Sequence, residues 1–275
     1  MTAVFTDLRA EVFATIADRT VTATLVAEGR GLLTPMSDAL DICRELGLRI
    51  CHALPERTNL TPGVEILRFA GNPESIARAE ERLIGALAKP SGIAGTTRQF
   101  VDAAAGRVRI VCGAWKKLPM SHKHMLREAI TAGGGEIRIA ENPFVYLDKN
   151  FVAMLGGPVP TLQAVRHLTE HRKVIQLNGS GETLAESACH AAEAGADTIF
   201  IDTGQREDIN GVSAELRRRG LRDGVEIAFA GGITLSDIGP LAELDVDAVD
   251  IGRGIIDAPI VDMSIDVIDI RSGGQ

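Results

Sequence analysis

The chain has 275 residues, of which 45% are hydrophobic and 24% charged, and its formal net charge is −8 at pH 7. This length and hydrophobic content predict a globular protein with one large domain or two smaller ones. The negative charge argues against a nucleic-acid or membrane-surface binder, because either needs a broad basic face. No apolar run approaches the ~18 residues that a membrane span needs, so we expect a cytoplasmic protein with no membrane partner.

The first hundred residues combine strands and helices that do not alternate regularly, which is typical of an α+β domain. We expect this N-terminal α+β domain, with a lead-in helix, to cover residues 1–105. Its predicted elements, in chain order, are a hairpin at 20–35, a helix at 36–47, a strand at 48–55, a hairpin-like segment at 58–71, and helices at 73–88 and 91–104.

Short β-branched runs alternate with amphipathic helical stretches from about Val108 onward, which predicts βα units and a parallel sheet. The strands are expected at 108–112, 136–139, 145–148, 174–177, 198–202, 225–229 and 248–251. The helices between them are expected at 122–131, 161–171, 182–194, 208–219 and 235–244. Seven such strands predict an α/β barrel or an incomplete parallel barrel over 106–260. A C-terminal segment, 261–275, is expected to return toward the N-terminal domain.

Glycine-rich turns follow the last two expected strands. Ala230, Gly231 and Gly232 follow the strand at 225–229, and Gly252 and Arg253 follow the strand at 248–251. Loops after the last two strands of a parallel barrel often bind phosphate, and glycines let backbone N–H groups approach an anion closely. These turns therefore predict a phosphate-binding site, although glycines that serve only tight turns would give the same pattern.

Other polar side chains are expected at the same face of the barrel. The strand-end residues are Trp115, Lys116, Lys117, Lys149, Gln176, Asn178 and Asp202. The segment "WKKLPMSHKHMLR" adds a local basic cluster to an acidic chain, which a polyanion would require. Its members are Lys116, Lys117, His122, Lys123, His124 and Arg127. A solvated helix face is the alternative interpretation of this cluster.

Several segments together resemble the quinolinate phosphoribosyltransferases, also called nicotinate-nucleotide pyrophosphorylases (carboxylating). They are "KPSGIAGTTRQFVDAAAGRVRI", "AITAGGGEIRI", "VYLDKNFVAMLGG", "AEAGADTIFID", "IAFAGGIT" and "DIGRGIIDAPIVDMSID", and the resemblance extends from about residue 21 to 266. That family transfers phosphoribosyl from phosphoribosyl pyrophosphate to the nitrogen of quinolinate and then decarboxylates the product. The resemblance implies the same two-domain fold and a phosphoribosyltransferase activity.

The resemblance also assigns roles to individual residues. Lys116 and Lys149 fall on the family's two active-site lysines, and Asp202 on the acidic residue near ribose and Mg²⁺. The glycines Gly231, Gly232 and Gly252 fall on its loops for the 5′-phosphate. Arg98 matches an arginine that reaches the neighbouring subunit's site. The residues expected to contact substrate are Arg98, Trp115, Lys117, Lys123, Arg127, Arg138, Gln176 and Asn178.

Departures from the family pattern concentrate on the acceptor side. Trp115 replaces an arginine, Arg138-Ile139 replaces a His-Arg pair, and Gln176 replaces a glutamate. A dicarboxylate such as quinolinate needs guanidinium groups to pair with it, so we expect a different nitrogen heterocycle as acceptor, such as one that stacks on Trp115. A member that has lost catalysis but still binds a phosphorylated ligand is one alternative. An authentic quinolinate enzyme with compensating residues is another.

Lys116, Lys149 and Arg138 are expected to neutralise the leaving pyrophosphate, while Asp202 holds a ribose hydroxyl or Mg²⁺.

We expect a homodimer, or an assembly of dimers, with active sites shared between subunits. The expectation rests on Arg98 and on an apolar helix stripe, Ile93, Thr97, Phe100, Val101 and Ala104. Burial of the stripe under the chain's own N-terminal domain is the alternative.

Overall fold

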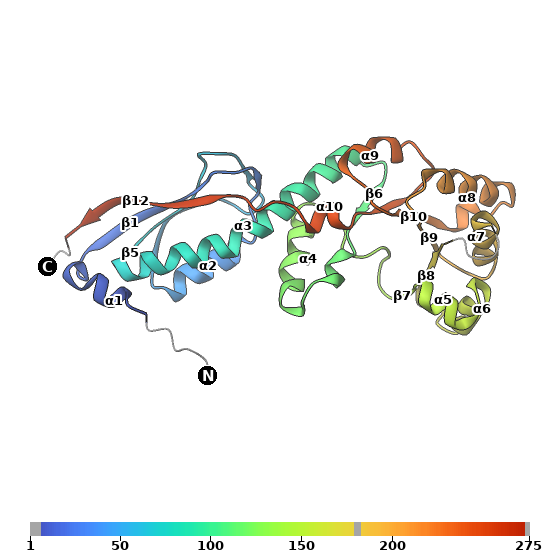
Figure 1. Ribbon diagram of the computed structural model, residues 1–275, viewed down its shortest axis with the longest axis horizontal. Coiled ribbons are helices and arrows are strands. Elements are labelled where there is room, and N and C mark those ends of the chain that lie inside the picture. Colours follow the sequence, from blue (N-terminus) through green and yellow to red (C-terminus); the bar gives the residue numbers. More distant parts are fainter. Residues whose placement is uncertain (1–6, 179–182, 273–275) are drawn as a thin grey trace. The chain divides into compact units, whose positions relative to one another are not determined.

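The computed structural model describes residues 7–178 and 183–272. By its internal contacts the chain divides into two units. The first unit comprises Met1–Thr96 with Ala258–Gln275, and the second comprises Thr97–Asp257. Figure 1 labels the helices and strands of both units.

The first unit is built on a four-stranded antiparallel sheet in the order β12-β1-β5-β3. Its strands are β1 (Thr20–Ala27), β3 (Arg49–Ala53), β5 (Glu65–Gly71) and β12 (Met263–Arg271). The short strands β2 (Gly31–Leu32) and β4 (Asn59–Leu60) pair with each other. The helices are α1 (Arg9–Val12), η1 (Ala14–Ile16) and α2 (Met36–Glu45).

Strand β1 does not form the hairpin that the sequence predicts for 20–35. It pairs instead with β12 and β5, while β2 pairs with β4. The alternating residues Val21, Ala23, Leu25 and Ala27 are buried in the core of the first unit, so β1 fills a central place in the sheet. The hairpin-like segment at 58–71 likewise splits between two sheets. Pattern alone identifies these strands but not their partners.

Helix α3 (Pro73–Ala104) is a single helix of 32 residues, where two helices were predicted at 73–88 and 91–104. Pro90 lies inside it. A proline in a helix interior lacks one N–H donor and often breaks a helix, which is why the sequence indicated a break there. Here Ile93, Phe100 and Ala104 beyond the proline are buried, and this packing favours the continuous helix.

The second unit contains a six-stranded parallel sheet in the order β6-β11-β10-β9-β8-β7. Its strands are β6 (Arg109–Val111), β7 (Phe144–Leu147), β8 (Arg172–Leu177), β9 (Thr198–Asp202), β10 (Glu226–Ala230) and β11 (Ala248–Asp250). Among the described residues β6 and β7 are edge strands that do not pair with each other. This arrangement confirms an incomplete parallel α/β barrel.

One of the seven predicted strands, at 136–139, does not form. Glu136 alone forms a parallel bridge to Val111, with Cys112 N donating to Glu136 O (2.8 Å). The next residues, "AENP" at 140–143, are poor strand formers, and Pro143 has no N–H to continue a ladder. The open side of the barrel therefore lies at this segment.

Helices and short 3₁₀ turns connect the strands of the second unit (Figure 1). They are η2 (Ala114–Lys117), η3 (Met120–His122), α4 (Lys123–Ala132), α5 (Lys149–Leu155), α6 (Pro158–Ala164), α7 (Leu184–Glu193), α8 (Arg206–Arg218), η4 (Arg222–Gly224), α9 (Leu235–Leu241) and α10 (Arg253–Ile256). Helix α6 begins and ends earlier than the predicted 161–171. Residue 182, the predicted start of α7, lies outside the described residues. No helix in the described parts of the chain is long and apolar enough to span a membrane.

The barrel interior is arranged in layers. Its apolar layer is a buried cluster formed by Val111, Ile139, Ala140, Val174, Phe200, Ala228, Ala230 and Ala248, with Phe144 and Tyr146 packed against it. Side chains alternate along a strand, so the residues two positions beyond this layer toward the C-terminal ends share its side of the sheet. Those residues are Gly113, Gln176, Asp202 and Asp250. They form the floor of the candidate site.

Candidate functional site

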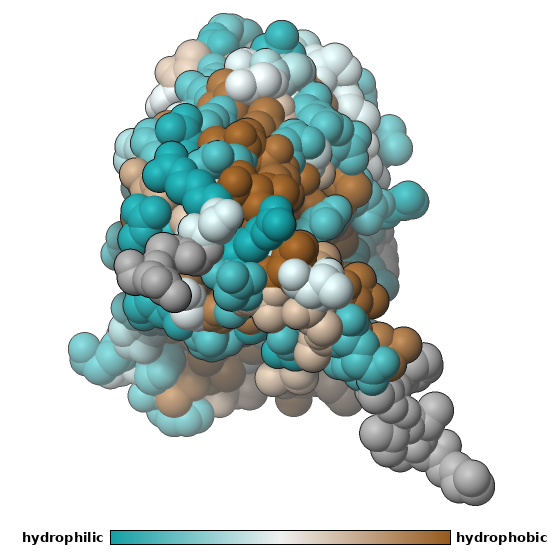
Figure 2. Space-filling model, turned by 90° about the vertical axis from the view of Figure 1, so that its left-hand side faces the viewer, coloured by the Kyte–Doolittle hydropathy of each residue, from teal (hydrophilic) through white to brown (hydrophobic). Residues whose placement is uncertain are grey.

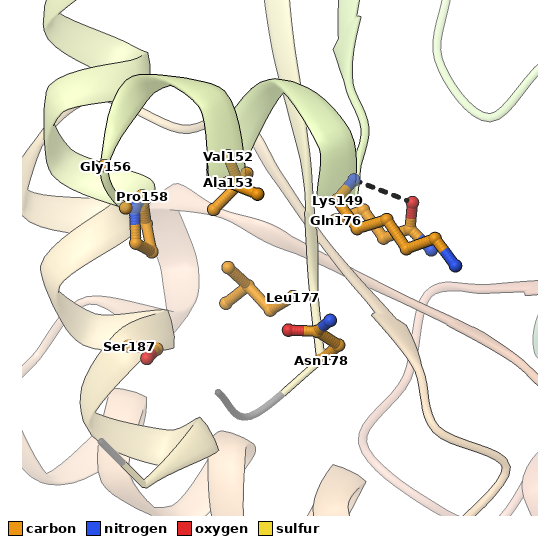
Figure 3. A pocket seen from close by; sticks show the side chains of 10 residues that line it. Lys149, Val152, Ala153, Gly156, Pro158, Gln176, Leu177, Asn178 and Ser187 are labelled. Atoms are coloured by element: carbon orange, nitrogen blue, oxygen red, sulfur yellow. Dashed lines mark hydrogen bonds between the residues drawn. The ribbon is translucent and has the colours of Figure 1, made fainter. Parts of the chain in front are cut away.

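A hydrogen-bonded chain links the carboxyl ends of β7, β8 and β9. Gln176 Nε2 donates to Asp202 Oδ2 (2.7 Å), and Gln176 Oε1 accepts from Lys149 N (3.2 Å) and from the Tyr146 hydroxyl (3.5 Å). Figure 3 shows Lys149 and Gln176 side by side, joined by the first of these two contacts to Oε1. Gln176 is buried, so its amide fixes the position of Asp202 at the mouth of the barrel.

Lys149 occupies its place because a helix begins there. Asp148 is the N-cap of α5 and accepts hydrogen bonds from Asn150 N (2.8 Å) and Phe151 N (3.1 Å). A cavity of about 280 Å³ adjoins this turn, and its lining includes Lys149, Gln176 and Asn178. Figure 3 shows these three residues around it. The sequence-predicted Lys149, Gln176 and Asn178 are thus brought to one place.

A second group of charges follows β6 and β11. Lys116 Nζ lies 5.3 Å from the centre of the Tyr146 ring, within reach of a cation–π interaction. Asp250, the last residue of β11, accepts a hydrogen bond from Gly113 N (2.9 Å). Burial raises the pKa of Asp250, and nearby Asp202 raises it further, whereas the Gly113 N–H and the charges of Lys116 and Lys117 lower it.

Three carboxylates lie near the Tyr146 hydroxyl. Burial raises the pKa of the Tyr146 phenol, and the negative charges of Asp250, Asp202 and Asp148 raise it further. The phenol therefore stays protonated and can donate a hydrogen bond. Tyr146 also meets Phe200 edge-on, with ring centres 5.9 Å apart. The C-terminal end of the barrel interior is thus a polar space, here called the chamber, which is lined by Gln176, Asp202 and Asp250. Tyr146 and Phe200 form its aromatic wall.

The turn at Gly231 and Gly232 adopts a backbone that favours glycine. Gly231 has φ 125° and Gly232 has φ 68°, and a Cβ on Gly231 would lie 2.5 Å from Gly204 Cα. Thr234 then starts α9 with a capping box. Gly252 is the N-cap of α10, and nothing lies within 4 Å of where its Cβ would be. Both turns directly follow β10 and β11, so they lie at the same end of the barrel as Asp202 and Asp250.

Trp115 is held in a fixed orientation beside this mouth. Its Nε1 donates to Ile137 O (2.9 Å), and the Arg127 guanidinium carbon lies 4.0 Å from its ring centre. Lys123 Nζ lies 5.9 Å from the same ring. Arg127 Nε is buried, and within the described residues it has no hydrogen-bond partner and forms no ion pair. This unpaired guanidinium stacked on an indole can receive an anion.

Comparison with known sequences decides the family. The description "Quinolinate phosphoribosyl transferase, C-terminal domain" matches residues 93–266, and "Quinolinate phosphoribosyl transferase, N-terminal domain" matches residues 5–91. The chain belongs to the quinolinate phosphoribosyl transferase family. It is a phosphoribosyltransferase of this type, and therefore a pentosyltransferase.

Family members of several organisms are similar over most of their length. The "Probable nicotinate-nucleotide pyrophosphorylase [carboxylating]" of Archaeoglobus fulgidus is 28% identical over 256 residues, which cover 92% of this chain and 96% of the relative. The human "Nicotinate-nucleotide pyrophosphorylase [carboxylating]" is 26% identical, with 88% and 81% covered. These names do not support the expectation of an acceptor other than quinolinate.

Solved structures agree with the fold. The nicotinate-nucleotide pyrophosphorylase from Francisella tularensis superimposes with a TM-score of 0.82 at 19% identity, covering 97% of this chain and 92% of the other. The enzyme from Pyrococcus furiosus also gives 0.82, at 21% identity, with 96% and 73% covered. At these identities the likeness concerns the fold.

Three sequence-predicted residues of this family member have partners that are not residues of the chamber. Arg138 donates to Asn142 (2.6 Å) and lies 5.9 Å from the Phe144 ring at the beginning of β7. Arg138 therefore lies toward the N-terminal ends of the strands, away from Lys149. Arg98 pairs with Asp102 (3.5 Å), and Arg253 pairs with Asp257 (2.7 Å).

Asp250, like Tyr146, is a residue of the site that the sequence did not predict. The strand at 248–251 reads as a short buried run, and an aspartate within it carried no motif. The signal was its spacing, because Asp250 ends its strand as Asp202 ends β9. Both aspartates are register partners of Ala230 on the strand between them.

Proposed function

We propose that this chain transfers the phosphoribosyl group of phosphoribosyl pyrophosphate to the ring nitrogen of a carboxylated heterocycle, with quinolinate as the first candidate acceptor. The bond from C1 of the ribose to the pyrophosphate oxygen breaks, and a bond from C1 to nitrogen forms. With quinolinate, loss of one carboxyl group as CO₂ would follow. The observation that carries the proposal is the joint placement of lysines, carboxylates and glycine turns at one mouth of the barrel.

The donor side accounts for most of these groups. Backbone N–H groups of the turns at Gly231, Gly232 and Gly252 would bind the 5′-phosphate, while Asp202 would hold a ribose hydroxyl. Negative charge builds up on the pyrophosphate oxygen as the C1 bond lengthens. Lys116 and Lys149, which project from the first turns after β6 and β7, would stabilise that charge.

The acceptor side supports a carboxylated ring. Arg127 is held over Trp115 at 4.0 Å and has no carboxylate partner among the described residues. A half-buried guanidinium without a counter-ion favours an anionic ligand. Trp115 replaces the arginine found in the family. Arg127, on α4, places a guanidinium group against Trp115, so a cation is again present at this position. Retention of an acidic acceptor follows from this replacement.

Mg²⁺ fits the proposal as a companion of the pyrophosphate. Mg²⁺ is commonly held by one or two carboxylates together with substrate phosphates. In residues 7–178 and 183–272 no group of three or more His, Cys, Asp or Glu side chains could hold a metal alone. Asp202 would be the protein ligand, and the bound ion would neutralise charge on the leaving pyrophosphate.

A different heterocycle is the second candidate acceptor. Ile139 occupies the place of a family arginine and is buried in the apolar layer, and the neutral amide of Gln176 replaces a glutamate. The first change removes a cation that could pair with a carboxylate, so it favours an acceptor with fewer carboxylates than quinolinate. The second removes a negative charge and leaves the number of carboxylates open.

The test is an assay of pyrophosphate and CO₂ release from phosphoribosyl pyrophosphate with quinolinate, and in parallel with nicotinate. We expect pyrophosphate release with a pyridine carboxylate. Arg127→Gln should raise the KM for that acceptor about 10- to 100-fold, because a charge-assisted hydrogen bond is lost, while the KM for phosphoribosyl pyrophosphate stays within about twofold. Arg217→Gln, an exposed arginine on α8, is the control.

Each negative result has its own meaning. Pyrophosphate release with nicotinate but not with quinolinate would establish the second candidate. Binding of phosphoribosyl pyrophosphate without release with any heterocycle would contradict the proposal and indicate a family member that has lost catalysis. An unchanged acceptor KM in Arg127→Gln would remove Arg127 from the acceptor site.

A further inference from the structure

Two carboxylates lie at equal height on the barrel floor. Asp202 on β9 and Asp250 on β11 are both register partners of Ala230 on β10. Neighbouring strands are about 4.8 Å apart, so the two aspartate Cα atoms are separated by about 10 Å. The side chain between them is a single methyl group, which leaves room above Ala230 for a ligand that contacts both carboxylates.

Each carboxylate has one oxygen already bound. Asp250 Oδ1 accepts from Gly113 N (2.9 Å), and Asp202 Oδ2 accepts from Gln176 Nε2 (2.7 Å). In the described part of the chain, no hydrogen bond reaches Asp250 Oδ2 or Asp202 Oδ1. Two acceptor oxygens on opposite sides of a small gap match a ligand with two hydroxyl donors.

We propose that Asp250 is a second ribose-binding residue, which together with Asp202 accepts hydrogen bonds from the two neighbouring hydroxyl groups of a phosphorylated ribose. This inference rests on the proposed function, because it names the part of the donor that Asp250 contacts. The acidic group that is missing at Gln176 on β8 is thereby supplied from β11.

The phosphate turns support this placement of the sugar. Gly231 follows Ala230 directly, and Gly252 lies two residues after Asp250. A ligand whose phosphate sits on these turns would therefore hold its sugar ring beside the two aspartates. One molecule, a ribose 5-phosphate unit, satisfies both parts of the site.

A diol fits the space between the two carboxylates better than a metal ion that bridges both would, and the Mg²⁺ proposed with the pyrophosphate would contact Asp202 alone. Lys116 and Lys117 lie close enough to Asp250 for their charges to act on it, and these cations oppose a divalent ion at the same place. One oxygen of each aspartate is also committed to an N–H donor. A hydroxyl needs only the single oxygen that remains.

The experiment is calorimetric titration of ribose 5-phosphate and 2-deoxyribose 5-phosphate without Mg²⁺. Asp250→Asn and Asp202→Asn should each weaken ribose 5-phosphate binding about 10- to 100-fold, as expected for a lost hydrogen bond to a charged group. One of the two variants should also lose the wild type's preference for ribose over 2-deoxyribose. Asp223→Asn, an exposed aspartate in η4, is the matched control and should bind like the wild type.

Wild-type affinity for ribose 5-phosphate in Asp250→Asn would overturn the inference. A loss that appears only with Mg²⁺ and phosphoribosyl pyrophosphate would also overturn it, because Asp250 would then act on the metal. If Asp250→Asn does not fold, Asp250→Ser takes its place. If neither folds, equal wild-type affinity for the ribose, 2-deoxyribose and 3-deoxyribose 5-phosphates overturns it.

The proposed function can fail separately. If the wild type binds ribose 5-phosphate with the expected sugar preference but releases no pyrophosphate from phosphoribosyl pyrophosphate, the role of Asp250 stands and the transfer reaction does not. If pyrophosphate is released while Asp250→Asn binds normally, the reverse holds.

Discussion

The Asp250 side chain lowers the stability of the folded protein when it is ionised. Its carboxylate is half-buried beside Asp202, and burial raises its pKa. A carboxyl group whose pKa is raised on folding prefers to bind a proton in the folded state. The ionised carboxyl group therefore makes the free energy of folding less favourable. As pH rises from about 4, the pKa of this group in the unfolded chain, through its raised pKa in the folded protein, the stability of the folded protein falls. Such a cost is common in site residues.

Asp250→Asn should therefore raise the melting temperature of the ligand-free protein at neutral pH. The asparagine can keep the hydrogen bond from Gly113 N, and it carries no charge to be buried. The difference from the wild type should shrink as pH falls toward 4, where Asp250 in the wild type becomes protonated. Differential scanning calorimetry from pH 4 to 8 measures this. A lower melting temperature at all pH values would show that Asp250 serves the fold instead.

Lys116, Lys149 and the glycine turns could be predicted from the sequence, whereas Asp250 could not. Lys116, Lys149 and the glycine turns follow apolar runs, so their position at the strand ends was predictable. Asp250 lies within the run, and only the register with Ala230 shows that it faces Asp202. Arg138 was placed by likeness to the family, but the segment that carries it forms no strand and leads it away from the chamber.

At the scale of elements, the turn after β10 needs glycine at two positions, for different reasons. Gly231 cannot carry a side chain because Gly204 is too close, whereas the space around Gly232 is open. Gly232 nevertheless has φ 68°, so any side chain there strains the backbone. A substitution at Gly232 thus tests phosphate binding only if the strain is held constant.

Gly232→Gln and Gly232→Glu form such a pair, because they share size and backbone strain and differ in charge. We expect Gly232→Glu to bind ribose 5-phosphate at least about tenfold more weakly than Gly232→Gln, since its carboxylate repels the phosphate at close range. Calorimetric titration at low salt measures the ratio, and melting curves check that both variants fold. Equal affinities would show that the phosphate does not bind at this turn.

Element pairing was the part of the fold that sequence could not supply. The pattern located most strands of the barrel to within a residue or two, because their apolar runs are short and well separated. It could not show that β12 from the chain end pairs with β1, since both partners of β1 are distant in sequence. It also divided α3 at Pro90, where buried residues on both sides keep one helix.

At the scale of the whole molecule, the stripe on α3 no longer argues for a partner. Ile93, Thr97, Phe100 and Ala104 are buried within the single chain. Phe100 belongs to the second unit, and a Cβ on Gly254 would lie 3.1 Å from its ring, so this part of the stripe packs within the barrel unit and not under the N-terminal domain. Exposed apolar side chains occur instead in the sheet of the first unit, at Ile50, Val267, Ile268 and Ile270. Figure 2 shows apolar residues gathered on one face of the molecule, among polar ones.

Arg98 carries the remaining argument for a shared active site. Its side chain is 40% exposed, and it pairs only loosely with Asp102 at 3.5 Å. A Cβ on Gly134 would lie 3.0 Å from Arg98 Nη2, so the guanidinium rests on the triple glycine and not on the chamber of its own chain. We predict that it completes the site of a second copy in a two-fold dimer.

Mixing two inactive variants tests this prediction. In a dimer of one Arg98→Ala chain and one Lys116→Ala chain, one site lacks both side chains and the other has both intact. Each variant alone should bind ribose 5-phosphate and phosphoribosyl pyrophosphate poorly, and the mixture, after subunit exchange, should recover up to about half of the sites in its mixed dimers. Titration of the mixture against each parent measures the recovery, and sedimentation gives the oligomeric state. A monomer at micromolar concentration would contradict the prediction. So would the absence of recovery once exchange is shown with tagged chains, because Arg98 would then act within its own chain or not at all.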